Sequence, residues 1–411
     1  MTKAVLETGS ELEAMQITAA VPSPAVAVPA SLHASLMARL DRLGLAKELA
    51  QIGAAIGREF SYELLVSVAP LGDERVQDAL GQLTASGLVF QRGTPPYAAY
   101  LFKHALVQDA AYGTLLKSKR QQLHSRIVRV LEEGFRGTAE TQPELLAHHC
   151  TQARCIEKAI AYRYKAARQA MARSGMAEAV AQLRKALELL ATLPADADRD
   201  RSEFELLVAL GGAFVATKGF AAPEVGQTYE RARELCRQRA EGPQVLPVLA
   251  GLYQYHSHAT GPEFGRQIAE ELLRLAEQQQ DAAARVVGHR TCGVSSLFGG
   301  HLAAAREHFD RALALYVSVD RNSAIFAPFS ETEVVCRSFK ALVLLWQGYP
   351  DQALASSGAA LGAARELGHA LTESQALYLN CWLHQVRGEP GIVRERASAM
   401  ISVTTEHNYP A

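Results

Sequence analysis

The sequence has no excess of charge of either sign and no long apolar run. Lys plus Arg number 42 against 43 for Asp plus Glu, a net charge of -1. This balance gives no global electrostatic case for nucleic acid or an anionic membrane as the main partner. No run of about 18 uncharged apolar residues is present, so we see no membrane span. The first residues, MTKAVLETGSELEAM, include acidic side chains and lack the apolar core of a signal peptide.

Cysteine and aromatic residues are also sparse. The six cysteines are scattered without the spacing of a disulfide framework, which is typical of free thiols in a reducing compartment, so we expect a cytoplasmic protein. Aromatic residues make up only 7% of the chain, whereas Ala, Leu, Glu, Gln and Arg, the strong helix formers, are abundant. With 411 residues, 48% hydrophobic and 21% charged, the composition indicates a folded, mainly helical protein of two or three domains.

The first part of the chain divides at a proline-rich segment. Residues 21–30 read VPSPAVAVPA, and three prolines in ten residues cannot continue a helix, so this segment is predicted to be an extended linker. Residues 31–112 then show helical segments followed by two short apolar runs, 88–91 and 99–103, on either side of Gly-Thr-Pro-Pro. Two such runs around a turn are typical of a β-hairpin. Three helices followed by a hairpin predict a winged-helix-like domain.

From residue 113 onward the sequence consists of helical segments separated by short breaks. In the clearest helix pair, Gly293 lies in the first helix, Gly300 at the turn, and Ala305 and Ala312 in the second helix. This spacing is that of the small residues in a tetratricopeptide repeat (TPR). Small residues are needed there because the two helices cross too closely for larger side chains.

The same spacing of small residues recurs in further copies. One copy contains Ala167, Gly175, Ala179, Leu183, Ala186 and Leu187, another contains Ala341, Gly348, Ala353, Ala360 and Leu361, and a weaker one contains Cys381, Gly388, Val393, Ala397 and Ile401. A generic helical bundle would also be rich in Ala and Leu, but small residues at matched positions are hard to obtain by chance. The predicted fold class is therefore mainly α, a winged-helix-like module followed by a TPR-type α-solenoid.

Several segments of the chain resemble one known family. VPASLHASLMARLDRLG, ELAQIGAAIGREFSYELL, YLFKHALVQDAAYGTLLKSKRQQLH and QPELLAHH are similar to bacterial multidomain signalling proteins. Those proteins join a class III adenylate/guanylate cyclase domain, a STAND-type ATPase and a TPR array. Farther on, TKGFAAPEVGQTYERARELC, GHLAAAREHFDRALALY, LWQGYPDQALA and NCWLHQVRGEP resemble the TPR part of the same proteins. The resemblance covers nearly the whole chain.

The resemblance also implies which domains of the family are absent here. The sequence holds no G-x-x-x-x-G-K-[ST] motif and no match to the metal-binding Asp pair of a cyclase, so an ATP phosphate cradle is missing. We interpret residues 1–30 as a remnant helix of the ATPase module plus the proline-rich linker, 31–112 as the winged-helix-like domain, and 113–411 as a TPR-type repeat array that is incomplete at its C-terminus. The chain is expected to be a fragment of a larger gene product or a truncated descendant.

His104 is the candidate site residue that the resemblance suggests. The run FKHALVQDAAY resembles the Met-His-Asp motif that opens a similar helix in related STAND switches, where the His reaches the β-phosphate of bound ADP. Ala105 replaces the Asp of that motif, so the match is partial. The alternative is that His104 only caps or packs the helix after the hairpin. We expect nucleotide sensing by His104 only in the intact switch, with ATP or ADP bound by the missing ATPase domain, and we expect no cofactor in this chain.

A cluster of possible metal ligands occurs in HHCTQARC. His148, His149, Cys150 and Cys155 carry imidazole and thiolate groups, which are zinc ligands. A closed zinc site needs four converging ligands, however, and a continuous helix spreads these residues around its circumference. We therefore predict that they are buried helix-packing residues and that no metal is bound.

The remaining polar candidates give weak signals. The helix DERVQDALGQLTASG, which would be the DNA-recognition helix of a winged helix, carries Asp73, Glu74 and Asp78, and an acidic face is repelled by phosphates. A basic cluster after the hairpin is more typical of a solvated face: Lys117, Lys119, Arg120, Arg126 and Arg129. The adjacent Arg58 and Glu59 are predicted to pin the turn between two helices. His256 and His258 lie on a predicted turn between helices, where a ligand-facing role is possible but has no support in the sequence.

Taken together, these patterns predict a non-catalytic scaffold that recognises a protein or peptide on the concave face of the repeat array. In the family this would be the sensor part of a STAND-type ATPase/cyclase signalling protein. One alternative is that the chain is a component of an adenylate/guanylate cyclase or ATP-binding ATPase, an assignment that it would inherit from the full-length family. The other is a winged-helix DNA-binding regulator, which the acidic helix disfavours.

Overall fold

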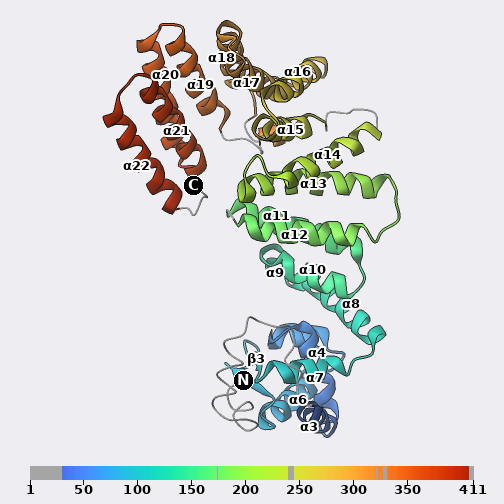
Figure 1. The fold of residues 1–411 in the computed structure, drawn as a ribbon. Helices are drawn as coiled ribbons and strands as arrows, with labels where there is room; N and C mark the ends of the chain where they lie inside the picture. Colours follow the sequence, from blue (N-terminus) through green and yellow to red (C-terminus); the bar gives the residue numbers. More distant parts are fainter. Residues whose placement is uncertain (1–29, 174, 239–244, 321–322, 327–330, 407–411) are drawn as a thin grey trace. The chain divides into compact units, whose positions relative to one another are not determined.

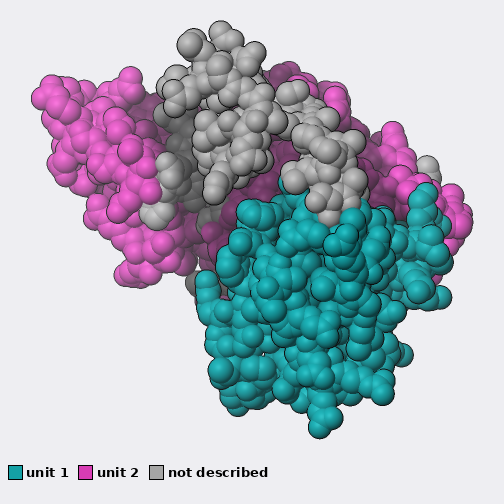
Figure 2. Space-filling model, turned by 90° about the horizontal axis from the view of Figure 1, so that it is seen from below, with its two compact units in different colours: residues 1–159 teal, residues 160–411 magenta. Residues whose placement is uncertain are grey.

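The structure is a computed structural model, and it describes residues 30–173, 175–238, 245–320, 323–326 and 331–406 (Figure 1). The chain divides into two compact units, residues 1–159 and residues 160–411 (Figure 2). The remnant helix and linker predicted for residues 1–30 lie outside the described residues, except for Ala30, where the first described helix begins. The predicted boundary at residue 112 lies inside the first unit.

The first unit combines helices with a small sheet. Its elements in chain order are α3 (Ala30–Asp41), α4 (Leu45–Ile56), β1 (Glu59–Ser61), α5 (Tyr62–Val68), α6 (Asp73–Ala85), β2 (Val89–Arg92), β3 (Ala99–Phe102), α7 (Ala105–Gly113), α8 (Lys117–Gly134), α9 (Arg136–Thr141) and α10 (Pro143–Gln152). The predicted hairpin is confirmed, because β2 and β3 pair antiparallel. Strand β1 was not predicted. Glu59, expected only to pin a turn, begins this strand and pairs with Leu101 of β3.

A glycine allows helix α4 to approach the sheet closely. A Cβ atom at Gly53 of α4 would lie only 2.7 Å from the ring of Phe60. The Phe60 ring therefore occupies the space that any other residue at position 53 would need. Phe60 in turn lies beside Tyr100 and Phe102 of β3, with ring centroids 5.8 and 5.7 Å away, and these three side chains are buried. This cluster forms the core between α4 and the sheet.

The second unit consists of helices arranged as successive hairpins. After α11 (Ile156–Ala172), which starts at the end of the first unit, the elements are α12 (Met176–Leu190), α13 (Ala197–Lys218), α14 (Pro223–Gln238), α15 (Val245–Ala259), α16 (Pro262–Gln278), α17 (Ala282–Phe298), α18 (Leu302–Tyr316), the short 3₁₀ helix η1 (Ala324–Phe326), α19 (Thr332–Trp346), α20 (Pro350–Leu367), α21 (Ala370–Val386) and α22 (Pro390–Glu406). From α12 to α22, each helix packs on the next along the chain, and α19 also contacts α17 and α21 (Figure 1). The predicted mainly α fold with an α-solenoid is confirmed.

The predicted small residues lie where the helices cross. Ala305 and Ala312 are buried in one cluster with Phe309, and a Cβ atom at Gly293 would come within 2.7 Å of the Phe309 ring. The turn glycines Gly300 and Gly348 have φ angles of 79° and 86°, in the left-handed region that favours glycine. The TPR-type spacing therefore has two causes: small residues are needed where the helices pack closely, and glycines are needed at the tight turns.

The weaker last copy was partly misassigned. Ile401 was expected to pack like its counterparts, but it is 60% exposed, and α22 has no buried residue. Met400 instead packs against the cluster formed by α20 and α21. Val393 and Ala397 are half-buried, and Met400 stands 12 residues after Gly388, as Ala312 does after Gly300, so the repeat register holds and only Ile401 departs from the prediction. Among the described helices of the whole chain, none is both long and apolar enough to cross a bilayer.

Candidate functional site

His104 lies at the start of α7, immediately after strand β3. It occupies the N-cap position with extended backbone angles, φ -135° and ψ 143°, and its side chain makes no capping hydrogen bond. The residue is exposed, as is its neighbour Lys103, whose ammonium lies 5.4 Å from the centre of the Phe90 ring. The His104 imidazole is therefore accessible to solvent and does not cap the N-terminus of α7.

The His and Cys cluster of α10 packs against a histidine that sequence analysis missed. His124 of α8 and His149 of α10 are buried, with their Nδ1 atoms 2.9 Å apart, and His124 Nε2 lies 3.0 Å from the hydroxyl of Tyr112 on α7. Burial, reinforced by the neighbouring imidazoles, lowers the pKa of His124 to about 4 and that of His149 to about 3. Both rings are therefore neutral at pH 7, and the chain of polar contacts joins α7, α8 and α10.

The four residues weighed as possible metal ligands differ in their burial. Cys150 is buried, and burial raises the pKa of its thiol to about 12, whereas His148 is exposed and Cys155 is half-buried. The expectation that all four residues are buried therefore holds for His149 and Cys150 but not for His148 and Cys155. Within the described part of the chain, no group of three or more His, Cys, Asp or Glu side chains is placed to hold a metal ion.

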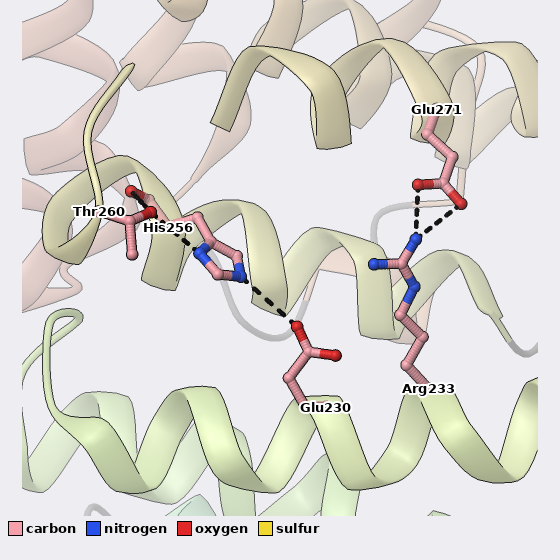
Figure 3. Close-up of polar contacts among 5 residues, drawn as sticks. All are labelled: Glu230, Arg233, His256, Thr260 and Glu271. Atoms are coloured by element: carbon pink, nitrogen blue, oxygen red, sulfur yellow. Dashed lines mark hydrogen bonds and ion pairs between the residues drawn. The ribbon is translucent and has the colours of Figure 1, made fainter. Parts of the chain in front are cut away.

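A set of polar contacts among five side chains joins helices α14, α15 and α16 of the second unit (Figure 3). Arg233 of α14 donates two hydrogen bonds, of 3.0 and 2.8 Å, to the carboxylate of Glu271 on α16. His256 of α15 places Nδ1 3.0 Å from the Thr260 hydroxyl and Nε2 3.5 Å from the carboxylate of Glu230 on α14. These contacts link the hairpins and bring together no nucleophile or set of metal ligands.

His256 and His258 were expected on a turn, but both lie in the last turn of α15. His256 is only 8% exposed, and its ring packs on Phe264 at a centroid distance of 4.6 Å. His258 stacks on Phe220 at 4.9 Å, with its Nδ1 atom 2.7 Å from the backbone oxygen of Gln254. Both imidazoles are engaged within the chain, so a ligand-facing role is not supported.

The most distinctive surface of the second unit is formed by aromatic side chains that sequence analysis did not single out. Phe298 of α17, Phe339 and Trp346 of α19, and Trp382 of α21 contact one another; we call these four residues the aromatic platform. The ring of Trp382 stacks on Phe298 with centroids 6.2 Å apart and meets Trp346 edge-on at 5.9 Å. Phe298 also meets Phe339 edge-on at 6.2 Å. The chain has two tryptophans, and both belong to this platform.

The repeat positions the exposed part of this surface. In three successive hairpins, the residue two positions before the turn glycine is large, apolar and exposed: Phe298 at 55%, Trp346 at 41% and Val386 at 45%. The corresponding glycines, at positions 300, 348 and 388, all have positive φ angles. Each first helix therefore ends at the same point of the repeat, and its last turn presents an apolar side chain to solvent.

Helix α21 extends this surface along its length. Leu371, Tyr378, Trp382 and Val386 are spaced by seven, four and four residues, so they form one stripe on the helix. Leu371, Tyr378 and Val386 are exposed, and Trp382 is half-buried. Large contiguous exposed apolar patches mark interaction sites more often than chance, because such a patch gains nothing from folding. The aromatic platform together with this stripe is therefore the candidate functional site.

Comparisons with known proteins give distant likenesses. No family model matches the chain. Among curated proteins, an uncharacterised protein of Rhizobium meliloti (strain 1021) is 29% identical over 232 residues. Those residues are 56% of this chain and 22% of the relative, so the chain spans less than a quarter of the length of that relative.

Several solved structures have a similar arrangement of helices. A STAND protein with a TPR sensor from Pyrococcus horikoshii is 12% identical, with a TM-score of 0.43 over 89% of this chain and 57% of that chain. NprR in complex with its cognate peptide NprX is 12% identical, with a TM-score of 0.45 over 81% and 84%. A Rap protein complexed with competence and sporulation factor is 11% identical, with a TM-score of 0.48 over 92% and 88%.

Proposed function

We propose that this chain is a non-catalytic recognition module that binds a protein or peptide through the aromatic platform. The observation that carries the proposal is the exposure of rings that also contact one another across α17, α19 and α21. Trp, Tyr and Phe are the side chains that dominate binding energy at protein interfaces, because they bury a large area with few rotatable bonds. The first helices of successive hairpins would then form the concave binding face of the array.

The position of the platform supports recognition over a purely structural role. Core residues such as Ala312 and Phe309 already fill the helix crossing of their hairpin. The three exposed positions before the turn glycines lie outside that buried cluster. The recurrence of exposed apolar side chains at one repeat position, in Phe298, Trp346 and Val386, supports a surface that a partner covers.

The first unit supports the wider context suggested by the family resemblance. Its order of a helix, a strand, two helices and a hairpin is the order expected of a winged helix and supports that prediction. The outer face of α6 carries exposed Asp73, Glu74 and Asp78, which disfavours DNA as the partner. The exposed His104 is available for nucleotide sensing in an intact STAND-type switch. In that context the repeat array would be the sensor that reports an occupied platform to an ATPase or cyclase elsewhere in the protein.

The proposal is tested by selecting phage-displayed random peptides on the full chain and on two variants. Phe298→Ala removes an exposed ring of the platform. Phe264→Ala removes a ring of similar exposure, 49%, on α16 in the same unit, and is the matched control. We expect enriched peptides that are retained by the wild-type chain and the control but not by Phe298→Ala. Enrichment of the same peptides on all three proteins would refute the proposed surface.

A further inference from the structure

The connection between α18 and α19 is much longer than the neighbouring connections of the array. It comprises residues 317–331, whereas residues 279–281 join α16 to α17 and residues 368–369 join α20 to α21. Those two connections show that a short turn is enough to join successive hairpins. Loops of the length found between α18 and α19 are uncommon and usually have a function of their own.

The described middle part of this connection packs back onto the array. Its 3₁₀ helix η1 lies against α15 and α17, the first helices of two successive hairpins. Ile325 is only 4% exposed, and the ring of Phe326 meets that of Tyr316 edge-on with centroids 6.0 Å apart. The Tyr316 hydroxyl donates a hydrogen bond to the carboxylate of Glu331, which joins the two ends of the connection. Ile325 is therefore the buried side chain of a segment that covers two first helices.

The two helices against which η1 packs are buried all round. Helix α17 is buried at every position from 286 to 293, and α15 at every position from 248 to 254. About two helical turns of unbroken burial leave no face of this part of either helix open to solvent. Helix α21, by contrast, keeps an exposed stripe that includes Leu371 and Tyr378. The row of first helices is thus open at α21 and closed in the middle of α15 and α17.

Helix α17 belongs to both the open and the closed surface. Its last residue, Phe298, is part of the aromatic platform, and the same helix packs against η1. A partner that extends from the platform along α17 toward α15 would find residues 323–326 already in place. Because the segment is tethered to the array, its effective concentration there is on the order of millimolar, and it competes with any weaker ligand.

We propose, on the basis of the recognition function above, that residues 323–326 are an internal ligand that covers α15 and α17 until a partner displaces it. The adjacent side chains of Ile325 and Phe326 indicate what the partner offers: a protein segment with a large aliphatic residue next to an aromatic one. The connection is thus an autoinhibitory segment. Its release lets the partner contact α15 and α17 in addition to the platform.

A peptide with the sequence of residues 318–331, SVDRNSAIFAPFSE, tests the proposal when it is added in trans. Its fluorescein-labelled form is titrated with the wild-type chain, Ile325→Asp and Val317→Asp, and binding is followed by fluorescence anisotropy. Val317 lies in the same connection but is 84% exposed, so Val317→Asp is the matched control. We expect Ile325→Asp to bind the peptide at least about tenfold tighter than the other two chains, because only this variant has lost its internal competitor.

Three results would overturn the internal ligand. The first is equal affinity of the peptide for all three chains, and the second is equal binding of a control peptide with Asp in place of its Ile. The third is no binding to an Ile325→Asp chain that melts at the wild-type temperature. If Ile325→Asp melts lower, Ile325→Ala is compared in the same way. A lowered melting temperature without peptide binding in both variants would show that η1 is part of the core and not a ligand.

The phage-selected peptides separate this proposal from the recognition function. Peptides whose binding depends on Phe298 should bind Ile325→Asp at least about threefold tighter than the wild-type chain, because more of the variant is in the open state. Equal affinity for both would overturn autoinhibition and leave the aromatic platform standing. Peptides that bind tighter to Ile325→Asp but do not depend on Phe298 would support the internal ligand and refute the platform.

Discussion

Tyr229 of α14 shows how single residues set the spacing of the helices. The side chain is fully buried, and Cβ atoms at Gly211 of α13 and Gly251 of α15 would lie 2.5 and 2.3 Å from its ring. The ring is therefore held between two helices that can approach only because both positions lack a side chain. The Tyr229 ring thus fills the space that side chains at positions 211 and 251 would otherwise occupy.

A pair of neighbouring glycines provides the test at this site. Gly211→Ala should destabilise the second unit by about 1–3 kcal/mol, because the Tyr229 ring must move in a packed core. Gly212→Ala is the control, since a Cβ atom there meets nothing within 4 Å and alanine favours the helix by about 0.5–1 kcal/mol. Urea denaturation followed by tryptophan emission measures both changes. Two variants of equal stability would contradict the packing of Tyr229.

Histidine pairs make the stability of the chain dependent on pH. His289 of α17 and His308 of α18 have Nδ1 atoms 3.0 Å apart. Burial, then the neighbouring His308 and the cations of Arg311 and Arg285, lowers the pKa of His289 from 6.5 to about 4. Burial also lowers the pKa of His308, where Arg311 lowers it further and Glu307 and Glu277 oppose the shift. The folded state thus holds both rings neutral.

The sign of the pH dependence follows from these lowered pKa values. The unfolded chain takes up protons on both histidines below about pH 6.5, whereas in the folded chain His289 stays neutral down to about pH 4 and the pKa of His308 is also lowered. The free energy of unfolding of the second unit should therefore be highest above pH 6.5 and fall steadily between pH 6.5 and 4. Urea titrations at pH 7 and pH 5 test this. In His308→Gln the fall should be smaller, and an identical fall in both proteins would contradict the role of the pair.

At the scale of helices, the close crossing of α17 and α18 should tolerate no larger residue. Ala312 is fully buried in the cluster with Phe309, so Ala312→Leu should cost about 1–3 kcal/mol. Arg311, the adjacent residue, is exposed and pairs with Glu307 at 2.6 Å, a surface contact of about 0–1 kcal/mol. Arg311→Leu should therefore be nearly silent. The test compares the melting temperatures of both variants with that of the wild-type chain. Equal shifts for the two substitutions would argue against the repeat register.

The helices were predictable from sequence where packing imposes a spacing. Gly293, Ala305 and Ala312 could be placed because a close crossing admits only small side chains, and Gly300 because its turn requires a positive φ. Strand β1 was missed because three residues are too few to show a period. Ile401 was expected to pack but is exposed, because among the described residues no further helix follows α22 to cover that side.

The aromatic platform could not be predicted in the same way. Phe298 and Trp382 are far apart in the sequence, and each resembles a core residue until the hairpins are stacked. His124 was missed for the same reason, because its partner His149 lies on another helix. One signal was present, however. The position two residues before the turn glycine carries Phe298, Trp346 and Val386 in successive copies, and repeated apolar residues outside the packing positions indicate a shared surface.

At the scale of the whole molecule, the chain is expected not to bind nucleotide by itself. The sequence has no phosphate-binding loop, and no Gly precedes any Lys. Calorimetric titration of the full chain with ATP in the presence of Mg²⁺ should give no binding at micromolar concentrations, and no hydrolysis or cyclic nucleotide should appear. Micromolar affinity for ATP would show a nucleotide site that the motif analysis missed and would revive the enzyme alternative.

We propose that this chain meets its partner at the aromatic platform. The most direct measurement is calorimetric titration of the most enriched phage-selected peptide, with the emission of Trp346 and Trp382 recorded in parallel. We expect one site, a tryptophan signal that saturates together with the heat, and weaker binding in Phe298→Ala but not in Phe264→Ala. Binding heat without any change in tryptophan emission, and with equal affinity in both variants, would contradict it.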